Sequence, residues 1–302
     1  MNKKIQTILF GAGKGCKEYM RNTASKRNFL AICDNDEKKH GTVFEGLMVI
    51  PAHTIHNYDF DEIVITTQWF NEVTKQLQAL NINPAAIVIP KKEELKQPKP
   101  FVDDATHTFA TSVLLLFANK AYEQNIEIFV DTGTLLGVVR NGEILRWDDD
   151  IDFAFDISKP NNDAKKLLEW VETVLAKNYT KKSYHIQTLY NSDNQIVDIS
   201  VDFLQKNLKA FRLSFNIRNN VGKNSIELAS LGMFYAPAKY FAFAEILDFQ
   251  GVKLQVPNNY KEYLCFVYGE WEKEKKEITM ADYNHTNEVD FATIQQAGLH
   301  TK

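Results

Sequence analysis

Two neighbouring stretches of the sequence indicate the fold class most clearly: GTLLGVVR at residues 133–140 and WDDDIDF at residues 147–153. In the second stretch, Asp150 and Asp152 alternate with Ile151 and Phe153, the period-two pattern of a strand with one buried face. The two carboxylates then project from the same face of that strand. Because clustered acidic side chains repel one another, the pattern favours a bound cation, and Mg²⁺ takes carboxylate and phosphate oxygens as ligands.

The same periodicity predicts which aspartates of the cluster face the cation. Asp148 shares the parity of Asp150 and Asp152, but it lies at the uncertain start of the strand. Asp149 is expected to point away. The competing interpretations are a solvated acidic turn and a calcium-binding loop. A solvated turn would not place Ile151 and Phe153 between the acids, and a calcium-binding loop requires a glycine and a distal glutamate at positions where this sequence has neither.

A third oxygen ligand and a general base are expected from VDISVDF at residues 197–203. Asp198, Ser200 and Asp202 share one face of the strand predicted there. One of Asp198 and Asp202 is expected to complete the metal shell, and the other to accept the proton of an attacking hydroxyl. The sequence leaves the choice between them open. The alternative is an amphipathic edge strand whose polar face is simply wet.

Gly133 and Thr134 predict a turn at a helix N-terminus, a position suited to phosphate. Arg140 follows this turn and is a candidate phosphate ligand, because a planar guanidinium donates paired hydrogen bonds to phosphate oxygens. The alternative for Arg140 is a structural ion pair with one of the nearby aspartates. Trp147 is expected to pack and to stiffen the acidic strand.

The first 95 residues alternate short apolar strands with helical stretches, which predicts a parallel sheet. GAGKGC at residues 11–16 separates a strand from a helix, the context of a Rossmann-like phosphate-binding turn. Asp34 ends the second strand about 20 residues on, where a ribose-binding acid belongs. Gly11, Gly13 and Asp34 are therefore candidate nucleotide-binding residues, although Cys16 replaces the usual last glycine. The alternative is a module that binds no ligand and uses its glycines only for the turn.

KKEELKQPKP at residues 91–100 predicts a linker between two domains. The fold class is therefore expected to be α/β, with a Rossmann-like domain of the nucleotide-binding type at residues 1–95 and a second, α+β domain at residues 101–302. In the second domain we expect helices at 109–124, 164–176 and 258–268, a hairpin at 185–190 and 195–204, and strands at 126–130, 210–217 and 232–235. The tail from about residue 288 is polar.

The overall composition indicates which kinds of partner and which cellular compartment to expect. Lys and Arg number 35 against 39 Asp and Glu, a net charge of −4 that does not favour nucleic acid as a partner. Cys16, Cys33 and Cys265 form no disulfide framework or metal-ligand spacing, which predicts a reducing, cytoplasmic location. No apolar run approaches the roughly 18 residues of a spanning helix, so membrane contact is expected to be peripheral at most.

These motifs, in this order and at this spacing, closely resemble the LicD family, which includes the fukutin-type transferases. The resemblance covers roughly residues 109–271, and VPNNY at residues 256–260, Tyr263-Leu264 and Tyr268-Gly269 add to it. It implies a nucleotidyltransferase-like fold for the second domain. It also implies metal-dependent transfer of a phospho-alcohol, such as phosphocholine or a polyol phosphate, from a CDP-linked donor to a sugar hydroxyl. The acceptor would be a cell-surface glycan or its lipid-linked precursor, as in lipopolysaccharide, capsule or teichoic acid.

Carried over by residue, the resemblance implies Asp150 and Asp152 as ligands of Mg²⁺ or Mn²⁺, with Asp202 or Asp198 as the third acid. The family's aspartate-isoleucine-phenylalanine-proline element is altered here, and the zinc-binding cysteines of the animal members have no counterpart. Glu245 is a loose match to a family glutamate. The first domain resembles the small Rossmann-like modules of sugar-modifying enzymes in bacterial polysaccharide pathways.

Two other functions compete with this one. The first domain could act on a nucleotide-linked sugar as an epimerase or reductase, which bound NAD(P) would support. The chain could also be a non-catalytic scaffold that binds a glycan precursor and organises an assembly.

Overall fold

The computed structural model describes residues 4–91, 94–95, 99–230, 234–274 and 300–301. The chain divides into two compact units, one running to residue 97 and the other from residue 98 to residue 274. Each unit is described by itself. Most of the polar tail predicted from about residue 288, and residues 232 and 233 of the strand predicted at 232–235, lie outside the described residues. In the described part of the chain, no helix has both the length and the apolar character that crossing a membrane requires.

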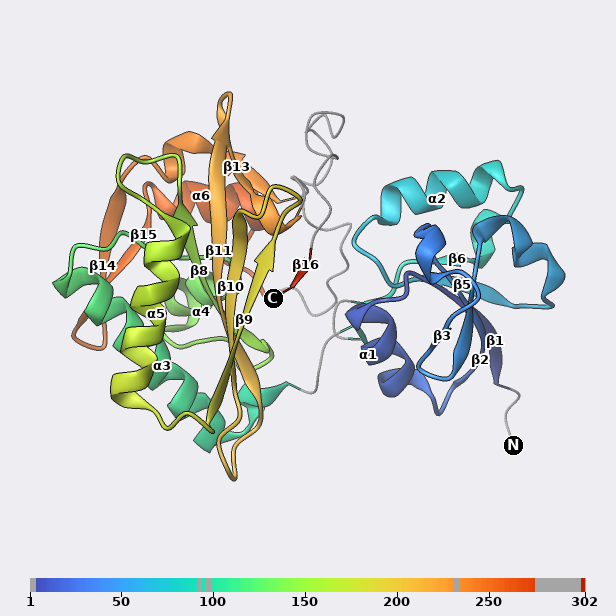
Figure 1. The fold of residues 1–302 in the computed structure, drawn as a ribbon, viewed down its shortest axis with the longest axis horizontal. Helices are drawn as coiled ribbons and strands as arrows, with labels where there is room; N and C mark the ends of the chain where they lie inside the picture. Colours follow the sequence, from blue (N-terminus) through green and yellow to red (C-terminus); the bar gives the residue numbers. More distant parts are fainter. Residues whose placement is uncertain (1–3, 92–93, 96–98, 231–233, 275–299, 302) are drawn as a thin grey trace. The chain divides into compact units, whose positions relative to one another are not determined.

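The first unit is a Rossmann-like sheet with the strand order β3-β4-β2-β1-β5-β6 (Figure 1). Its central strand β1 is buried on both faces, as expected of parallel strands covered by helices. Leu9 packs with Cys16 and Tyr19 of α1, whereas Ile8 packs in a separate cluster with Leu77 of α2. The elements are β1 (Ile5–Phe10), α1 (Lys14–Thr23), β2 (Arg27–Cys33), η1 (Glu37–Lys39), β3 (Val43–Phe44), β4 (Leu47–Ile50), η2 (Ala52–Asn57), β5 (Glu62–Ile65), α2 (Phe70–Ala79), η3 (Pro84–Ala86) and β6 (Ile87–Val88).

One edge of this sheet differs from the sequence prediction. Gly46 and Glu45 form a turn in which both residues have positive φ, 83° and 47° respectively. The turn joins β3 to β4 as an antiparallel hairpin. The remaining strand pairs of the sheet are parallel, as predicted.

The second unit is an α+β domain built on a mixed sheet (Figure 1). Only β8 and β11 pair in parallel, and their neighbours in the sheet run antiparallel. The elements are η5 (Pro100–Val102), α3 (Asp104–Glu123), β7 (Phe129–Val130), α4 (Thr132–Asn141), β8 (Asp150–Asp156), α5 (Ala164–Asn178), β9 (Tyr184–Tyr190), β10 (Ile196–Phe203), β11 (Phe211–Val221), β12 (Asn224–Glu227), η6 (Leu228–Ser230), β13 (Tyr235–Pro237), η7 (Ala238–Tyr240), β14 (Ala244–Phe249), β15 (Val252–Pro257), α6 (Tyr260–Tyr268) and β16 (His300–Thr301).

An aromatic core covers one face of this sheet. Phe153 of β8 stacks on Phe215 of β11 with ring centres 5.5 Å apart. Phe117 of α3 and Trp170 of α5 meet the edge of Phe215, so both helices pack on this face. The apolar residues of the acidic strand therefore point into the core, and the opposite face carries its carboxylates.

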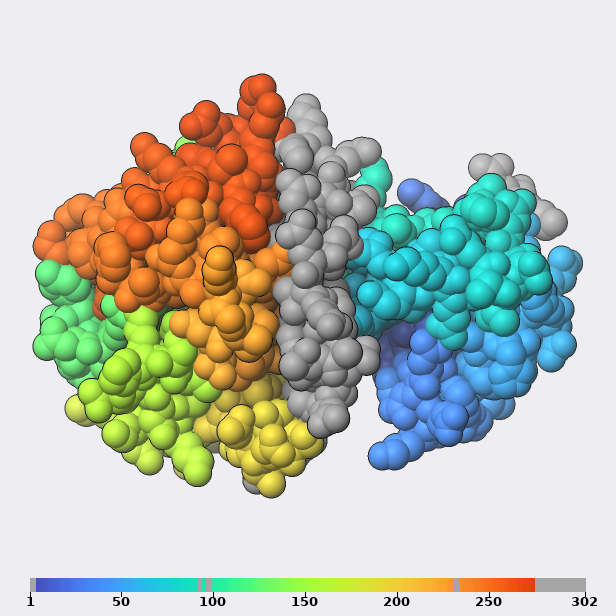
Figure 2. All heavy atoms as spheres, turned by 90° about the horizontal axis from the view of Figure 1, so that it is seen from above, coloured from blue at the N-terminus to red at the C-terminus, as the bar shows by residue number. Residues whose placement is uncertain are grey.

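Most elements of the second unit lie where the sequence predicts them. The hairpin of β9 and β10, the helix α5 and the end of α6 at Gly269, which has φ 66°, agree with the prediction. The strand predicted from residue 126 is shorter, because only Phe129–Val130 pairs with β8. Residues from β13 to α6, orange to red in Figure 2, form a continuous part of this unit's surface.

Candidate functional site

The register of three strands gathers polar side chains on one face of the second unit's sheet. β11 lies between β8 and β10. The two strands that carry the acids therefore do not pair with each other directly. Directly paired residues project to the same side of a sheet and form rows across it. The rows are Asp150, Arg212 and Asp202, then Asp152, Ser214 and Ser200, then Asn216 with Asp198.

Asp152 is held through both its backbone and its side chain. Oδ2 accepts a hydrogen bond from Oγ1 of Thr132 at 2.6 Å, and Oδ1 accepts a longer one from Asn216 at 3.3 Å. The backbone N–H of Asp152 donates to Oγ1 of Thr134 at 2.9 Å, and its C=O accepts from the N–H of Asp131 at 3.0 Å. These contacts fix the position of Asp152 relative to the start of α4.

Negative charge accumulates at the start of β8. Carboxylate oxygens of Asp148, Asp149 and Asp150 lie within 4.8 Å of one another, a spacing that can hold a metal ion. Desolvation, and then the charge of Asp150, raise the pKa of Asp152 well above its ordinary value. A cation would relieve this repulsion, so the residues present fit a divalent metal. The expectation that Asp149 points away does not hold, because β8 begins only at Asp150.

Helix α4 begins beside these acids. Its N-cap is Asp131, so Gly133 and Thr134 lie in the first helical turn rather than before it. A Cβ at Gly133 would meet Oδ2 of Asp148, so any larger residue there would displace that carboxylate from its present position. Thr134 is buried, and its hydroxyl accepts from the backbone N–H of Asp152. Thr134 thereby fastens α4 to β8. The phosphate contact expected of the Gly133-Thr134 segment stays a prediction.

Asp202 is bound by an arginine of the neighbouring strand. Nε of Arg212 donates to Oδ1 of Asp202 at 2.8 Å, and Nη2 donates to Oδ2 at 2.9 Å. Nη2 also donates to Gln187 at 2.8 Å. Because β11 lies between them, β10 is about 10 Å from β8, two strand spacings. The predicted role of Asp202 as a third ligand beside Asp150 and Asp152 therefore does not fit this geometry.

Asp198 has a different environment from Asp202. It pairs with Asn216, whose amide contacts Asp152. Desolvation raises the pKa of Asp198 to about 6, although the hydrogen bond with Ser200 and the charge of Arg212 act against this. A carboxyl group with a pKa in this range suits proton transfer near neutral pH, so Asp198 is the better candidate for a general base.

Arg140 lies in the last turn of α4, about 10 Å along the helix from Gly133. Its Nη1 donates to the backbone oxygen of Trp271 at 3.3 Å, and its guanidinium lies over the ring of Trp147, 5.7 Å from the centroid. Desolvation lowers the pKa of Arg140. Within the described part of the chain it forms no ion pair with an aspartate, so the structural alternative considered from the sequence is not seen there.

A buried ionic network lies behind the first turn of α4. Asp131 has no exposed surface, and its Oδ1 accepts a short hydrogen bond from the hydroxyl of Tyr263 on α6. Nη1 of Arg218 lies 3.8 Å from Oδ2 of Asp131 and 3.9 Å from Oε2 of Glu227. Ser225 positions Arg218 by accepting hydrogen bonds from Nε at 3.2 Å and from Nη2 at 2.9 Å.

Sequence reasoning missed Arg212, Asn216, Asp131 and Tyr263, which all contribute to the site. One signal was available, because RLSFN at residues 212–216 alternates polar and apolar side chains within a strand that was predicted. Nothing in the local sequence indicates that β11 lies between β8 and β10, or that Tyr263 reaches Asp131. Those contacts depend on tertiary packing.

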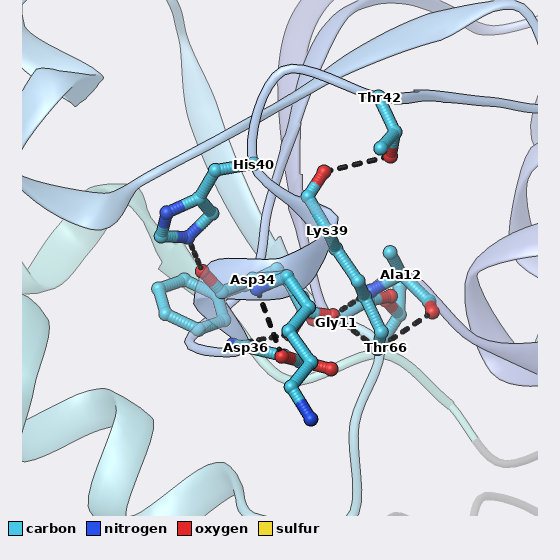
Figure 3. Close-up of polar contacts among 10 residues, drawn as sticks. Gly11, Ala12, Asp34, Asp36, Lys39, His40, Thr42 and Thr66 are labelled. Carbon is cyan, nitrogen blue, oxygen red and sulfur yellow. Dashed lines mark hydrogen bonds and ion pairs between the residues drawn. The ribbon is translucent and has the colours of Figure 1, made fainter.

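In the first unit, Asp34 ties the glycine loop to the next turn (Figure 3). Its Oδ2 accepts hydrogen bonds from the N–H of Ala12 at 2.7 Å and from Nζ of Lys39 at 3.0 Å, and Oδ1 accepts from the N–H of Asp36 at 2.9 Å. Desolvation raises the pKa of Asp34, but these hydrogen bonds outweigh it and the pKa lies below the ordinary value. Asp34 therefore has partners within the protein on both oxygens, and its predicted contact with a ribose stays a prediction.

The glycines of this loop have separate structural roles. Gly11 has φ +108°, and a Cβ there would lie 2.9 Å from Cβ of Thr67. A Cβ at Gly15 would lie 2.5 Å from the backbone oxygen of Thr66, so Gly15 allows the close helix–strand packing usually given by the last glycine of the fingerprint. No described atom lies within 4 Å of a Cβ at Gly13, the N-cap of α1.

A cavity of about 320 Å³ lies beside this loop, at the carboxyl ends of β2 and β4. Its lining includes Asp34, Asn35, His40, His53 and Gln76. Open α/β sheets bind ligands at this edge. A nucleotide in the first unit therefore stays a prediction.

In the second unit, the acid-bearing strand β8 is bound to the first turn of α4, and its carboxylates lie on the face of the sheet opposite the aromatic core. This arrangement defines the unit as a nucleotidyltransferase-type domain. Residues 125–259 match the family model described as LicD/FKTN/FKRP, nucleotidyltransferase domain. The match confirms, for this part of the chain, the resemblance recognised in the sequence.

Residues 1–88 match a second model, described as C2185-like, N-terminal. A search of the curated proteins found no match to the chain. One similar solved structure is UDP-D-quinovosamine 4-dehydrogenase from Vibrio fischeri, with 19% identity, coverage of 31% of this chain and 84% of that chain, and a TM-score of 0.26. Another is an oxidoreductase from Agrobacterium radiobacter in complex with NAD⁺, L-tartaric acid and magnesium, with 13% identity, coverage of 97% and 95%, and a TM-score of 0.28. Neither likeness bears on activity.

Proposed function

We propose that the second unit catalyses metal-dependent transfer of a phospho-alcohol from a CDP-linked donor to a sugar hydroxyl. The phospho-alcohol is of the phosphocholine or polyol-phosphate type, and the acceptor is a cytoplasmic precursor of a cell-surface glycan such as lipopolysaccharide, capsule or teichoic acid. The match to the LicD/FKTN/FKRP family supports a glycan-modifying phosphotransferase in general terms. For this chain, the supporting observation is the cluster of carboxylates at Asp148, Asp149 and Asp150, with Asp152 further along β8 and bound to Thr132 at the start of α4.

Asp150 and Asp152 are the proposed ligands of Mg²⁺ or Mn²⁺, with Asp148 beside them. Carboxylate oxygens suit these hard cations, which complete their shells with water and substrate phosphates. When bound, the metal would neutralise charge on the transferring phosphoryl group and on the leaving phosphate. The raised pKa of Asp152 is consistent with this role, because burial and then the negative charge of Asp150 disfavour its ionised form, and a bound cation would favour that form.

Other side chains of the same face supply the remaining roles. Arg212 is proposed as a fixed cation for the donor diphosphate, since Asp202 and Gln187 hold its guanidinium in the row of Asp150. Asp198 is proposed as the base that accepts the acceptor's hydroxyl proton. The positive end of the α4 dipole, at Gly133, favours negative charge at this point. Arg140 remains a candidate at the far end of the helix.

The proposal is tested by two substitutions at the metal ligands. Asp150→Asn and Asp152→Asn are each expected to reduce Mg²⁺-dependent CMP release from CDP-choline, CDP-glycerol or CDP-ribitol by about a hundredfold or more. Circular dichroism and the urea midpoint should remain close to those of the wild type. Asp193→Asn, an exposed position in the turn between β9 and β10, is the matched control and should keep full activity. Unchanged turnover in both ligand variants would contradict the metal site.

A further inference from the structure

Thr132 has a backbone conformation that a β-branched residue seldom adopts. Its φ is 46°, in the left-handed region, and it is the first residue of α4. Such a conformation is strained for threonine and persists only where the surroundings enforce it. Strained residues of this kind gather at functional sites, so the position calls for a physical explanation.

The surroundings that enforce this conformation are rigid and buried. Oδ1 of Asp131 accepts hydrogen bonds from the N–H of Thr132, at 2.8 Å, and from the hydroxyl of Tyr263. The N–H of Asp131 is bound to the backbone oxygen of Asp152, which extends the pairing of β7 with β8 up to this residue. Arg218 lies against the other oxygen of Asp131. The residue before Thr132 is therefore fixed from three directions.

The strained backbone gives the Thr132 hydroxyl one particular direction. Because φ sets where the Cβ points, the left-handed conformation directs Oγ1 to Oδ2 of Asp152, where it donates at 2.6 Å. Among the described residues, Oδ1 of Asp152 accepts only the longer hydrogen bond from Asn216, at 3.3 Å. The two oxygens of the carboxylate are thereby distinguished, with Oδ2 anchored and Oδ1 the more available.

We propose that Thr132 is a positioning residue, whose strained conformation anchors one oxygen of Asp152 so that the other is presented to the metal. The inference rests on the proposed function, because it assumes that Asp152 is a ligand. Groups that orient a metal ligand through a hydrogen bond commonly contribute ten- to a hundredfold in metal affinity. Thr132 itself does not touch the substrate in this account.

Three substitutions separate the hydroxyl from the backbone strain. Thr132→Val keeps the shape and removes the hydroxyl, so Mn²⁺ affinity measured by calorimetry on the full chain should fall about tenfold. Thr132→Ser keeps the hydroxyl and should bind Mn²⁺ within about threefold of the wild type. Thr132→Gly removes the hydroxyl and relieves the strain. It should therefore lose Mn²⁺ affinity like the valine variant while its urea midpoint rises.

In Thr132→Gly the Mn²⁺ affinity should fall while the urea midpoint rises. If Thr132 had only a structural role, a more stable variant would not bind the metal more weakly. Gln250→Gly is the matched control, because it relieves a φ of 52° in the turn between β14 and β15, away from the acids. It should raise the urea midpoint and leave Mn²⁺ binding unchanged. Wild-type affinity in both Thr132→Val and Thr132→Gly would overturn the inference. A wild-type chain that bound no Mn²⁺ would overturn the proposed function, and the inference with it.

Discussion

Glu227 of β12 pairs with Arg218 of β11, at a buried position where an ionised carboxylate is unfavourable because it loses its hydration. Desolvation raises the pKa of Glu227 to about 7. The positive charge of Arg218 lowers this pKa, whereas the negative charges of Asp131 and Asp198 raise it further. Between its ordinary pKa of 4.5 and this value, the folded protein keeps a proton that the unfolded chain has released. The contribution of Glu227 to stability therefore becomes less favourable as pH rises from about 4.5 to about 7.

Glu227→Gln is expected to remove this pH dependence. Glutamine is neutral at every pH and resembles the protonated side chain, so the variant should gain about 1–3 kcal/mol over the wild type at pH 8 and little at pH 4.5. Urea unfolding at the two pH values measures the difference. Glu172→Gln, at an exposed position on α5, is the control and should leave the slope of stability against pH unchanged. Equal slopes for the wild type and Glu227→Gln would refute the assignment.

At the scale of elements, two glycines of the same loop are expected to differ sharply. Gly15→Ala places a Cβ 2.5 Å from the backbone oxygen of Thr66, so α1 must move away from the end of β5. We expect a loss of about 1–3 kcal/mol, the usual cost of overpacking. Gly13→Ser meets no described atom within 4 Å at its Cβ and places a good capping residue at the start of α1, so its effect should stay within about 0.5 kcal/mol.

Urea-dependent hydrogen exchange at β1 and β5 measures this pair of variants, because it follows the first unit separately from the second. Similar exchange in Gly15→Ala and Gly13→Ser would show that the close approach of α1 to the sheet does not limit stability. The wild type provides the reference for both.

The elements that the sequence predicted best are those set by local pattern. The alternation at Asp150–Asp156 placed β8 and its buried face correctly, and the glycine after residue 268 marked the end of α6. Asp149 was misjudged because strand periodicity was extended one residue beyond the strand. The order of β8, β11 and β10 could not be predicted, because it depends on pairing between distant segments. For that reason the ion pair that binds Asp202 was missed.

In the candidate site, too, the sequence predicted what depends on local pattern and missed what depends on tertiary packing. Acids and glycines were recognisable from residue type and spacing, whereas their partners were not. Thr134 was expected to contact a ligand, yet it is buried and serves the backbone of Asp152. Asp34 was expected to bind ribose, yet its oxygens accept from Ala12, Asp36 and Lys39. In both cases the side chain has partners within the protein that the sequence did not indicate.

At the scale of the whole molecule, the two units match different family models and carry different candidate binding residues. The first matches its own family model at residues 1–88 and closes its glycine loop with Asp34. The second matches the LicD/FKTN/FKRP model at residues 125–259 and carries the acidic face. We therefore expect the residues that bind the metal and the donor phosphates to lie in the second unit alone.

The most direct test of this account is calorimetric titration of the full chain with CDP, in Mg²⁺ and in EDTA. We predict that CDP binds in Mg²⁺ more tightly than UDP or GDP, and that EDTA or Asp150→Asn removes the binding. CDP binding of equal strength in EDTA, or in Asp150→Asn, would contradict the metal-dependent site. Equal affinity for the three nucleotides, or binding of none, would contradict the CDP-linked donor.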